Sequence, residues 1–186
     1  MQVAVYPGTF DPLHIGHLAI LRHLVSCGRF DAVYLIVSPQ NPFKDESRLL
    51  TATRRTTAAK KAVARYPELA CVSVDDIEFG LPSPNYTLKT LNCLQEREPG
   101  NSFTLIIGGD NLDAFRKWKA YDSILLNYGV LVFPREGADC ETVRADLMDE
   151  NPLYRIDIAG TSLVNVSSTQ IRSALANGED TSDILM

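Results

Sequence analysis

Short apolar runs rich in β-branched residues alternate along the chain with longer segments whose apolar positions recur at helical spacing. The short runs predict six strands, at Val3–Tyr6, Ala32–Val37, Cys71–Val74, Phe103–Ile107, Val130–Phe133 and Tyr154–Ile158. The longer segments predict helices at Ile15–Cys27, Thr51–Tyr66, Tyr86–Arg97, Cys140–Asp149 and Ser168–Ala176, with one or two more within Asp113–Asn127.

This alternation predicts how the elements assemble. Parallel strands need crossover connections, and a helix can supply each of them here. We therefore expect one domain over residues 1–186, an α/β fold with a Rossmann-like, doubly wound parallel sheet and helices on both faces. A chain of 186 residues has the size of one ordinary domain. Ligands of such sheets bind at the carboxyl ends of the strands, so the loops that follow the strands are the places to search.

Composition narrows the class of protein. Hydrophobic residues make up 45% of the chain and charged residues 22%, which is typical of a soluble globular protein. The net charge of −5 argues against a general nucleic-acid binder, because neutralising phosphates requires a basic face. Apolar runs such as Ala32–Val37 are too short to span a membrane, and Met1–Tyr6 is predicted as a strand rather than a signal peptide. Four widely spaced cysteines predict reduced thiols in a cytoplasmic protein. The sequence leaves open whether the protein forms a homo-oligomer.

The loop after the first strand reads Tyr6-Pro-Gly-Thr-Phe-Asp-Pro-Leu-His-Ile-Gly-His17 and holds two of the three histidines. A spacing of three places His14 and His17 on one face of the first helical turn. The helix N-terminus favours an anion, and two imidazole donors beside it suit developing phosphoryl charge. A metal site and a chance surface pair are the alternatives, but no motif supplies further ligands, so no metal site is predicted. A ligand-facing first-turn histidine is expected to add little stability.

A second candidate lies near the other end of the chain, where Val166-Ser-Ser-Thr-Gln-Ile-Arg172 leads into the last predicted helix. Serine and threonine are preferred helix caps, so capping alone accounts for these hydroxyls. Alternatively, the same hydroxyls and N–H groups bind phosphate, and Arg172 holds phosphate oxygens one turn further on. The residues themselves leave both interpretations open.

The two segments resemble the two signatures of the HxGH nucleotidyltransferase superfamily, whose members join a nucleoside triphosphate to a phosphate-bearing acceptor. The Gly-Thr-Phe turn with its histidine pair matches the first signature, and the Ser-Ser-Thr-x-hydrophobic-Arg run matches the second; the two lie about 150 residues apart. The resemblance implies catalytic roles for His14, His17 and Arg172, and nucleotide binding by Gly8, Thr9, Phe10, Ser167, Ser168 and Thr169.

Further segments resemble bacterial nicotinate-mononucleotide adenylyltransferases over nearly the whole chain: Ser38–Lys44, Glu78, Asn85–Leu91, Ile107–Asn111, Trp118 and Phe133–Arg135. This second resemblance implies that Lys44 is catalytic. It also implies nucleotide binding by Gly108, Asp110 and Arg135, and an acceptor site of Asn41, Tyr86, Thr87 and Trp118 in which the tryptophan stacks on the pyridine ring.

Some of these residues also have purely structural interpretations. Lys44 is equally well a solvated loop residue, Trp118 a packing residue and Thr87 the start of a helix. Two neighbouring arginines on the second predicted helix, Arg54 and Arg55, are interpreted as part of its solvated face.

The resemblance implies transfer of AMP from ATP to nicotinate mononucleotide, giving deamido-NAD and pyrophosphate. The acceptor phosphate is then the nucleophile, and Mg²⁺ is expected to accompany ATP. The expected partners are ATP and nicotinate mononucleotide, with neither nucleic acid nor membrane. Two alternatives stay open: a phosphopantetheine adenylyltransferase, which the Tyr6–Pro12 turn resembles equally well, and an inactive nucleotide-binding module. His14, Trp118 and the Tyr86–Thr87 helix start favour the nicotinate enzyme over the phosphopantetheine enzyme.

Overall fold

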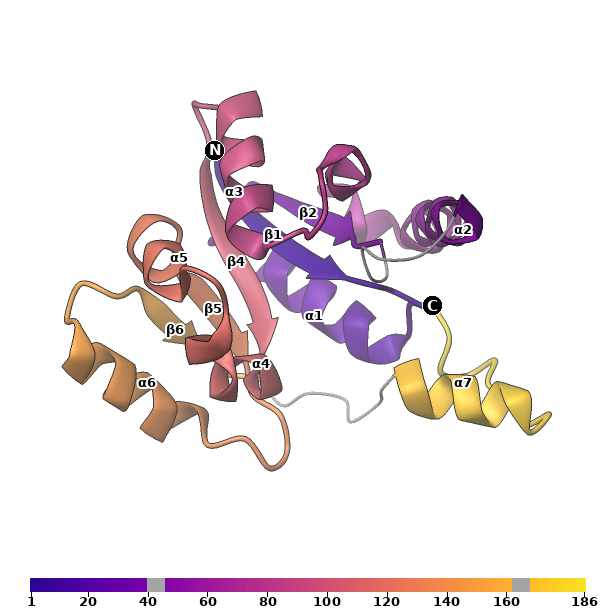
Figure 1. The fold of residues 1–186 in the computed structure, drawn as a ribbon. Helices are drawn as coiled ribbons and strands as arrows, with labels where there is room; N and C mark the ends of the chain where they lie inside the picture. Colours follow the sequence, from indigo (N-terminus) through magenta and orange to yellow (C-terminus); the bar gives the residue numbers. More distant parts are fainter. Residues whose placement is uncertain (40–45, 162–167) are drawn as a thin grey trace.

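The computed structural model describes residues 1–39, 46–161 and 168–186, with side chains from residue 51 onward in the second range. Six strands form one sheet in the order β3-β2-β1-β4-β5-β6, and every neighbouring pair is parallel (Figure 1). The strands are β1 (Gln2–Gly8), β2 (Ala32–Val37), β3 (Val72–Asp75), β4 (Ser102–Gly108), β5 (Val130–Phe133) and β6 (Ile156–Ile158). The predicted doubly wound α/β fold is therefore confirmed.

Helices connect the strands, and short 3₁₀ turns complete the connections. The α-helices are α1 (Ile15–Ser26), α2 (Glu46–Val63), α3 (Thr87–Arg97), α4 (Gly109–Asp113), α5 (Tyr121–Asn127), α6 (Cys140–Glu150) and α7 (Ser168–Ala176). The 3₁₀ turns are η1 (Pro67–Leu69), η2 (Ile77–Gly80) and η3 (Phe115–Lys117).

The start of α4 differs from the prediction, which placed the next helix from Asp113 onward. The helix begins at Gly109, directly after β4, although glycine disfavours helices. A Cβ at Gly109 would lie 2.7 Å from the Cys140 Sγ of α6. The close approach of α4 and α6 therefore requires glycine here and outweighs its low helix propensity.

Two hydrophobic clusters cover the two faces of the sheet. Along β1, Ala4 and Tyr6 pack with α1 and α2, whereas Val3 and Val5 pack with α3, α4, α5 and α6. Successive strand residues point to opposite faces, so a strand buried on both sides is apolar at nearly every position. This arrangement explains the continuous apolar runs in the sequence.

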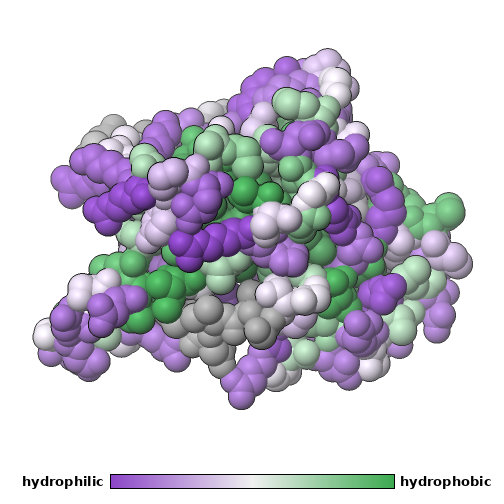
Figure 2. Space-filling view, turned by 180° about the vertical axis from the view of Figure 1, so that it is seen from behind, coloured by the Kyte–Doolittle hydropathy of each residue, from purple (hydrophilic) through white to green (hydrophobic). Residues whose placement is uncertain are grey.

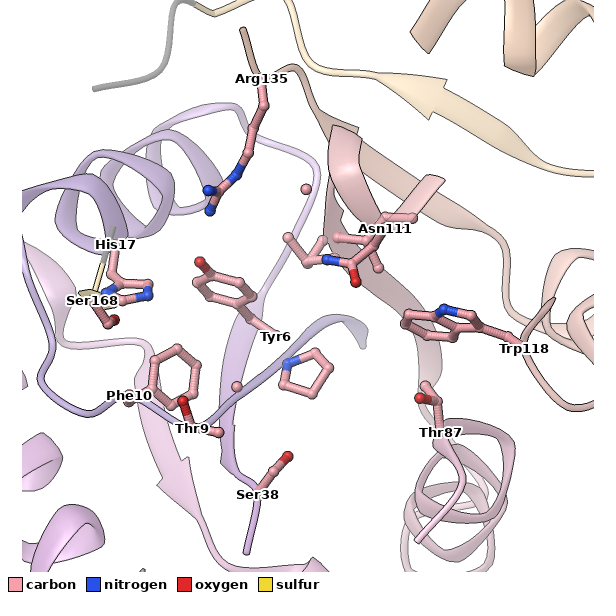
Figure 3. A pocket seen from close by; sticks show the side chains of 15 residues that line it. Tyr6, Thr9, Phe10, His17, Ser38, Thr87, Asn111, Trp118, Arg135 and Ser168 are labelled. Carbon is pink, nitrogen blue, oxygen red and sulfur yellow. The ribbon is translucent and has the colours of Figure 1, made fainter. Parts of the chain in front are cut away.

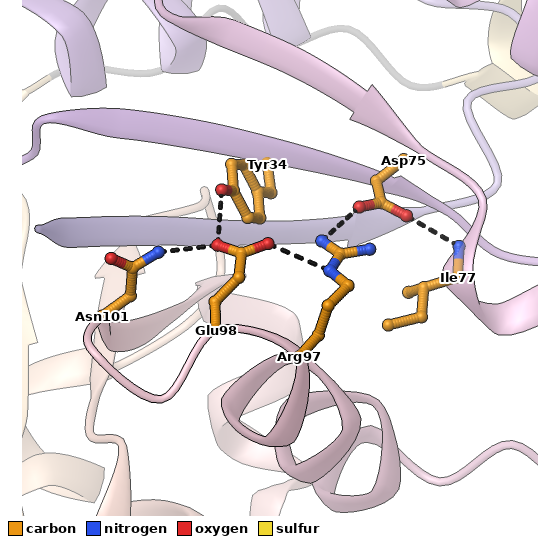
Figure 4. Close-up of polar contacts among 6 residues, drawn as sticks. All are labelled: Tyr34, Asp75, Ile77, Arg97, Glu98 and Asn101. Carbon is orange, nitrogen blue, oxygen red and sulfur yellow. Dashed lines mark hydrogen bonds and ion pairs between the residues drawn. The ribbon is translucent and has the colours of Figure 1, made fainter.

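A network of polar contacts joins the end of α3 to β2 and β3 (Figure 4). The Arg97 guanidinium lies 2.6 Å from the Asp75 carboxylate, and the Tyr34 hydroxyl donates to Glu98 at 2.8 Å. Asn101 also donates to Glu98, at 2.6 Å. These half-buried groups fix the position of α3, whose opposite end faces the candidate site.

Three further features concern the surface, the helices and the cysteines. In the view from behind, hydrophobic groups are interrupted by hydrophilic ones (Figure 2). Among the described residues, no helix is long and apolar enough to cross a membrane. All four cysteines are free thiols, as predicted.

Candidate active site

A cavity of about 370 Å³ opens beside the carboxyl ends of β1 and β4. These are the strands between which the sheet order reverses, the usual ligand position in such folds. His17 and Ser168 lie on one side of the cavity and Trp118 and Thr87 on the other, with Tyr6 between them (Figure 3). Of the predicted site residues, the cavity brings together Gly8, Thr9, Phe10, His17, Thr87, Gly108, Trp118, Arg135 and Ser168.

The turn after β1 is shaped by Gly8 and Phe10. A Cβ at Gly8 would lie 2.8 Å from the Phe10 ring, so only glycine admits the ring at this position. Phe10 itself has a φ of 46°, in the left-handed region that non-glycine residues rarely adopt. Its ring packs edge-on against His17, with ring centroids 5.2 Å apart. The turn thus packs the Phe10 ring against the His17 ring and restricts its position.

His14 and His17 together close the start of α1. The Gly16 N–H donates to His14 Nδ1 at 3.2 Å, and the His14 N–H donates to His17 Nδ1 at 3.2 Å. Because each Nδ1 accepts a hydrogen bond, each neutral ring carries its proton on Nε2. His17 lines the cavity, whereas His14 is buried behind it with ring centroids 3.7 Å apart. The pair therefore offers one Nε2–H donor at the cavity and a second directly behind it.

This arrangement corrects one expectation. A ligand-facing His17 was expected to add little stability, yet its ring satisfies a backbone N–H that the helix start would otherwise leave unpaired. Losing a helix cap costs about 1 kcal/mol. His17 therefore serves both the site and the helix.

Burial keeps both rings neutral. Burial is the largest cause and the positive Arg135 a smaller one, and together they lower the pKa of His14 to about 4 and contribute to a pKa of about 3 for His17. For His17, the neighbouring His14 contributes in the same direction. Neutral imidazoles donate a hydrogen bond through Nε2–H without an ionisation step.

We expect these shifts to make stability depend on pH. Both native pKa values lie below the unfolded value near 6.5, so between pH 6.5 and 4 the unfolded chain binds protons that the native chain does not. The free energy of unfolding then falls as pH falls through this window, at pH 5 by on the order of 2 kcal/mol for each histidine. Urea unfolding at pH 7 and pH 5 measures it.

The matched control is His14→Gln, whose stability should fall less between pH 7 and pH 5. Histidine C2–H resonances give a direct reading, because those of His14 and His17 should shift only slightly between pH 8 and pH 5, with no midpoint in that range. Titration of both near pH 6.5 would contradict the buried, neutral pair.

One wall of the cavity includes the turn after β4. Arg135 follows β5, and its Nε lies 3.3 Å from the Asp110 carboxylate of α4. A Cβ at Gly108 would lie 2.5 Å from that carboxylate, so glycine leaves room for the ion pair. Asp110 does not itself line the cavity; Arg135 does.

Trp118 and the start of α3 form the side of the cavity opposite His17. Trp118 packs against Phe115, with ring centroids 4.9 Å apart, so it is a packing residue, and its indole also lines the cavity. Stacking of the indole on a pyridine ring stays a prediction. Thr87 is the first residue of α3, and no side chain caps that helix start. The half-exposed Tyr86 lies outside the cavity lining and carries the Lys119 ammonium 4.5 Å from its ring centroid.

A buried carboxyl supports this helix start. The Thr90 hydroxyl of α3 donates to Glu78 at 2.9 Å, and burial raises the pKa of Glu78. Asn85 donates to the Glu78 carbonyl at 2.9 Å. These bonds connect η2 to the segment that leads into α3 and to α3 itself.

The C-terminal motif binds the loop that precedes α1. The Ser168 hydroxyl donates to the Pro12 carbonyl at 3.3 Å, and the Arg172 guanidinium donates to the Asp11 carbonyl at 2.8 Å. Arg172 also donates to the Thr169 hydroxyl at 3.0 Å. Thr169 and Arg172 are exposed and lie outside the cavity lining, so among the described residues of this motif Ser168 alone lines the cavity.

Three predicted residues, Asn41, Lys44 and Ser167, lie outside the described residues. The prediction missed other lining residues, Tyr6, Pro7, Ser38, Ile106, Ile107 and Asn111. All of them lie at the carboxyl end of a strand or just after it, which is the signal that could have found them.

The solvated face assigned to Arg54 and Arg55 is wrong for Arg55. Arg54 is exposed, but Arg55 is only 6% exposed and donates to the carbonyls of Thr9 and Ser38. The sequence shows two adjacent arginines, and only the position of α2 decides which of them points inward.

Comparisons with known proteins agree with this geometry. The model of the cytidylyltransferase-like family matches residues 5–174. A probable nicotinate-nucleotide adenylyltransferase of Flavobacterium psychrophilum is 38% identical over 185 residues, covering 100% of this chain and 92% of that protein. Its counterpart in Bacteroides fragilis is 36% identical, covering 96% and 84%.

A solved structure is similar in fold. Nicotinic acid mononucleotide adenylyltransferase of Plasmodium falciparum, complexed with NaAD, has a TM-score of 0.78 at 16% identity, covering 98% of this chain and 87% of that one. From the sequence matches together with the fold, we conclude that this chain belongs to the nicotinate-nucleotide adenylyltransferase family of cytidylyltransferase-like proteins.

Proposed function

We propose that this protein transfers AMP from ATP to nicotinate mononucleotide and releases deamido-NAD and pyrophosphate. One observation carries the proposal: a single cavity has an imidazole donor on one side and an indole beside an uncapped helix start on the other. The imidazole donor suits the phosphates of ATP, and the helix start beside the indole suits the carboxylate of a pyridine ring. The printed names of the relatives support the same activity.

In this reaction an oxygen of the acceptor phosphate forms a bond to the α-phosphorus of ATP. The bond from that phosphorus to the bridging oxygen breaks, and its electron pair leaves with pyrophosphate. No protein nucleophile is needed, so catalysis consists of positioning and charge stabilisation. We assign the Nε2–H of His17 to the oxygens of the α-phosphate and the bridge, with His14 behind it as second donor.

The remaining phosphates are assigned to the turn Gly8–Phe10 and to Ser168, Thr169 and Arg172. Gly108, Asp110 and Arg135 are assigned to the nucleoside part of ATP. Lys44 and Ser167 complete the nucleotide site by resemblance alone. Trp118, Thr87 and Tyr86, with Asn41 by resemblance, are assigned to the acceptor.

Mg²⁺ is proposed to enter with ATP. Across the described ranges, no three histidine, cysteine or acidic side chains gather to hold a metal. Mg²⁺ does not need such a cluster, because it coordinates phosphate oxygens of ATP and retains several of its water ligands. When bound, the ion neutralises phosphate charge. Because its product is deamido-NAD, we place the enzyme in NAD synthesis. We place it in the cytoplasm because its free thiols suit a reducing compartment.

The decisive experiment measures pyrophosphate release from MgATP with nicotinate mononucleotide or phosphopantetheine as acceptor. We expect release with the mononucleotide only. Release with phosphopantetheine instead would favour the sister enzyme, and no release with either acceptor would favour the inactive module.

Arg172→Ala tests the phosphate assignment of the C-terminal motif. We expect the KM for ATP to rise and kcat to fall, because an exposed guanidinium that already holds the Asp11 carbonyl is placed to receive phosphate oxygens. A purely structural residue would lower the melting temperature and leave the ATP kinetics unchanged. Both quantities are measured on one preparation, with Arg172→Lys as the conservative control.

A further inference from the structure

Arg55 of α2 is a buried cation that the proposed mechanism does not use. The residue is 6% exposed. Both terminal nitrogens donate to the Ser38 carbonyl at 3.0 Å, and Nη1 also donates to the Thr9 carbonyl. The guanidinium therefore binds backbone from two loops, one after β1 and one after β2.

Its hydrogen-bond partners are unusual for a buried charge. Within the described part of the chain, only main-chain carbonyls accept from this guanidinium, and Nε has no partner. Asp11 favours the charged form electrostatically but forms no ion pair with the guanidinium, and burial, the larger effect, lowers the pKa of Arg55. Burying a charge without a carboxylate in contact is unfavourable unless several hydrogen bonds compensate it. A lysine has a single ammonium in place of the planar fork and cannot reproduce this arrangement. The residue is thus costly for the fold, and packing alone does not explain it.

Both residues that Arg55 holds line the cavity. Thr9 and Ser38 directly follow the neighbouring strands β1 and β2, and the Ser38 N–H donates to the Gly8 carbonyl at 2.8 Å. Arg55 thereby joins α2 to the turn after β1 and to the end of β2, two segments that also bond to each other. In a trans peptide the carbonyl and the following N–H point in opposite directions, so the Phe10 N–H points away from Arg55. A carbonyl bound to a cation also polarises its peptide and strengthens that N–H as a donor.

We propose that Arg55 is a positioning residue for adenylyl transfer, holding Thr9 and Ser38 so that the turn after β1 receives the triphosphate of ATP. This inference rests on the proposed function. Arg55 does not touch substrate; it acts through the backbone of the turn. Displacement of a phosphate-binding turn by about 1 Å is enough to cost on the order of 10²-fold in rate.

The test compares Arg55→Met and Arg55→Lys with Arg54→Met, a change at the exposed neighbour on the same helix. We expect Arg54→Met to behave as wild type. Arg55→Met should lower kcat/KM for ATP by about 10–100-fold, with a raised ATP KM. Arg55→Lys should recover only part of this loss, because an ammonium lacks the planar fork of donors.

The acceptor provides the readout that separates positioning from folding. Trp118 is the only tryptophan of the chain and lies on the acceptor side, so its fluorescence reports binding of nicotinate mononucleotide without catalysis. We expect the Kd for this acceptor to be unchanged in Arg55→Met and Arg55→Lys. A loss of activity that only follows the loss of folded protein, with both KM values unchanged, would overturn the proposal.

Wild-type ATP kinetics in a folded Arg55→Met would equally overturn it. If Arg55→Met does not fold, Arg55→Lys decides, because wild-type ATP kinetics in that variant would refute a role of the planar fork. Absence of transfer by the unmutated protein would instead refute the proposed function, so the two failures are distinguishable.

Discussion

Replacing His17 with alanine is expected to lower kcat by about 10²–10³, the usual loss for one donor that acts in the transition state. The His17 ring lines the cavity, and its Nδ1 accepts the His14 N–H, so the remaining Nε2–H is the group available to the phosphoryl oxygens. Steady-state rates at saturating MgATP and acceptor measure the effect.

The same variant should lose about 1 kcal/mol of unfolding free energy, because the His14 N–H loses its cap. Such a loss leaves a protein of ordinary stability folded, so the rate and stability effects separate. His23→Ala is the control: His23 lies on the same helix, packs against Phe133 and does not line the cavity. Wild-type turnover by folded His17→Ala would contradict the assignment.

The second large effect concerns the choice of acceptor. We expect nicotinate mononucleotide to be preferred over its amide analogue by about 10²–10⁴ in kcat/KM. The two differ in a carboxylate against a neutral amide. Helix N–H donors pair with a carboxylate but not with the NH₂ of an amide, and each unmet donor costs about 1–3 kcal/mol.

The structure supplies the charges behind this preference. The start of α3 has no side-chain cap, and the Lys119 ammonium lies beside it over the Tyr86 ring. Both features favour an anion at this position.

The measurement compares kcat/KM for the two mononucleotides at saturating MgATP. Lys119→Ala should lower the ratio, because it removes the positive charge beside the helix start, whereas Lys117→Ala, an exposed neighbour, should leave it unchanged. Equal values for both acceptors in the unmutated protein would refute the nicotinate assignment and leave adenylyl transfer intact.

Periodicity predicted the sheet well because strands buried on both faces are apolar throughout. The runs Ala32–Val37 and Val130–Phe133 form strands at those bounds, and the order of elements implied parallel pairing. The segment after β4 was harder to predict, because Gly108 and Gly109 disfavour a helix locally. Their role depends on α6 and Arg135, which come much later in the chain.

The sequence by itself determined the family, the α/β class and the turn that carries His14 and His17, because local spacing and local propensity encode these features. Only the tertiary structure decided that His17 lines the cavity while His14 lies behind it, and that Arg55 is buried while Arg54 is exposed. It also decided that Arg172 reaches the Asp11 carbonyl. These outcomes depend on which strand ends and helices meet. Contacts between residues far apart in sequence form only when the strands assemble in the order that places β1 beside β4.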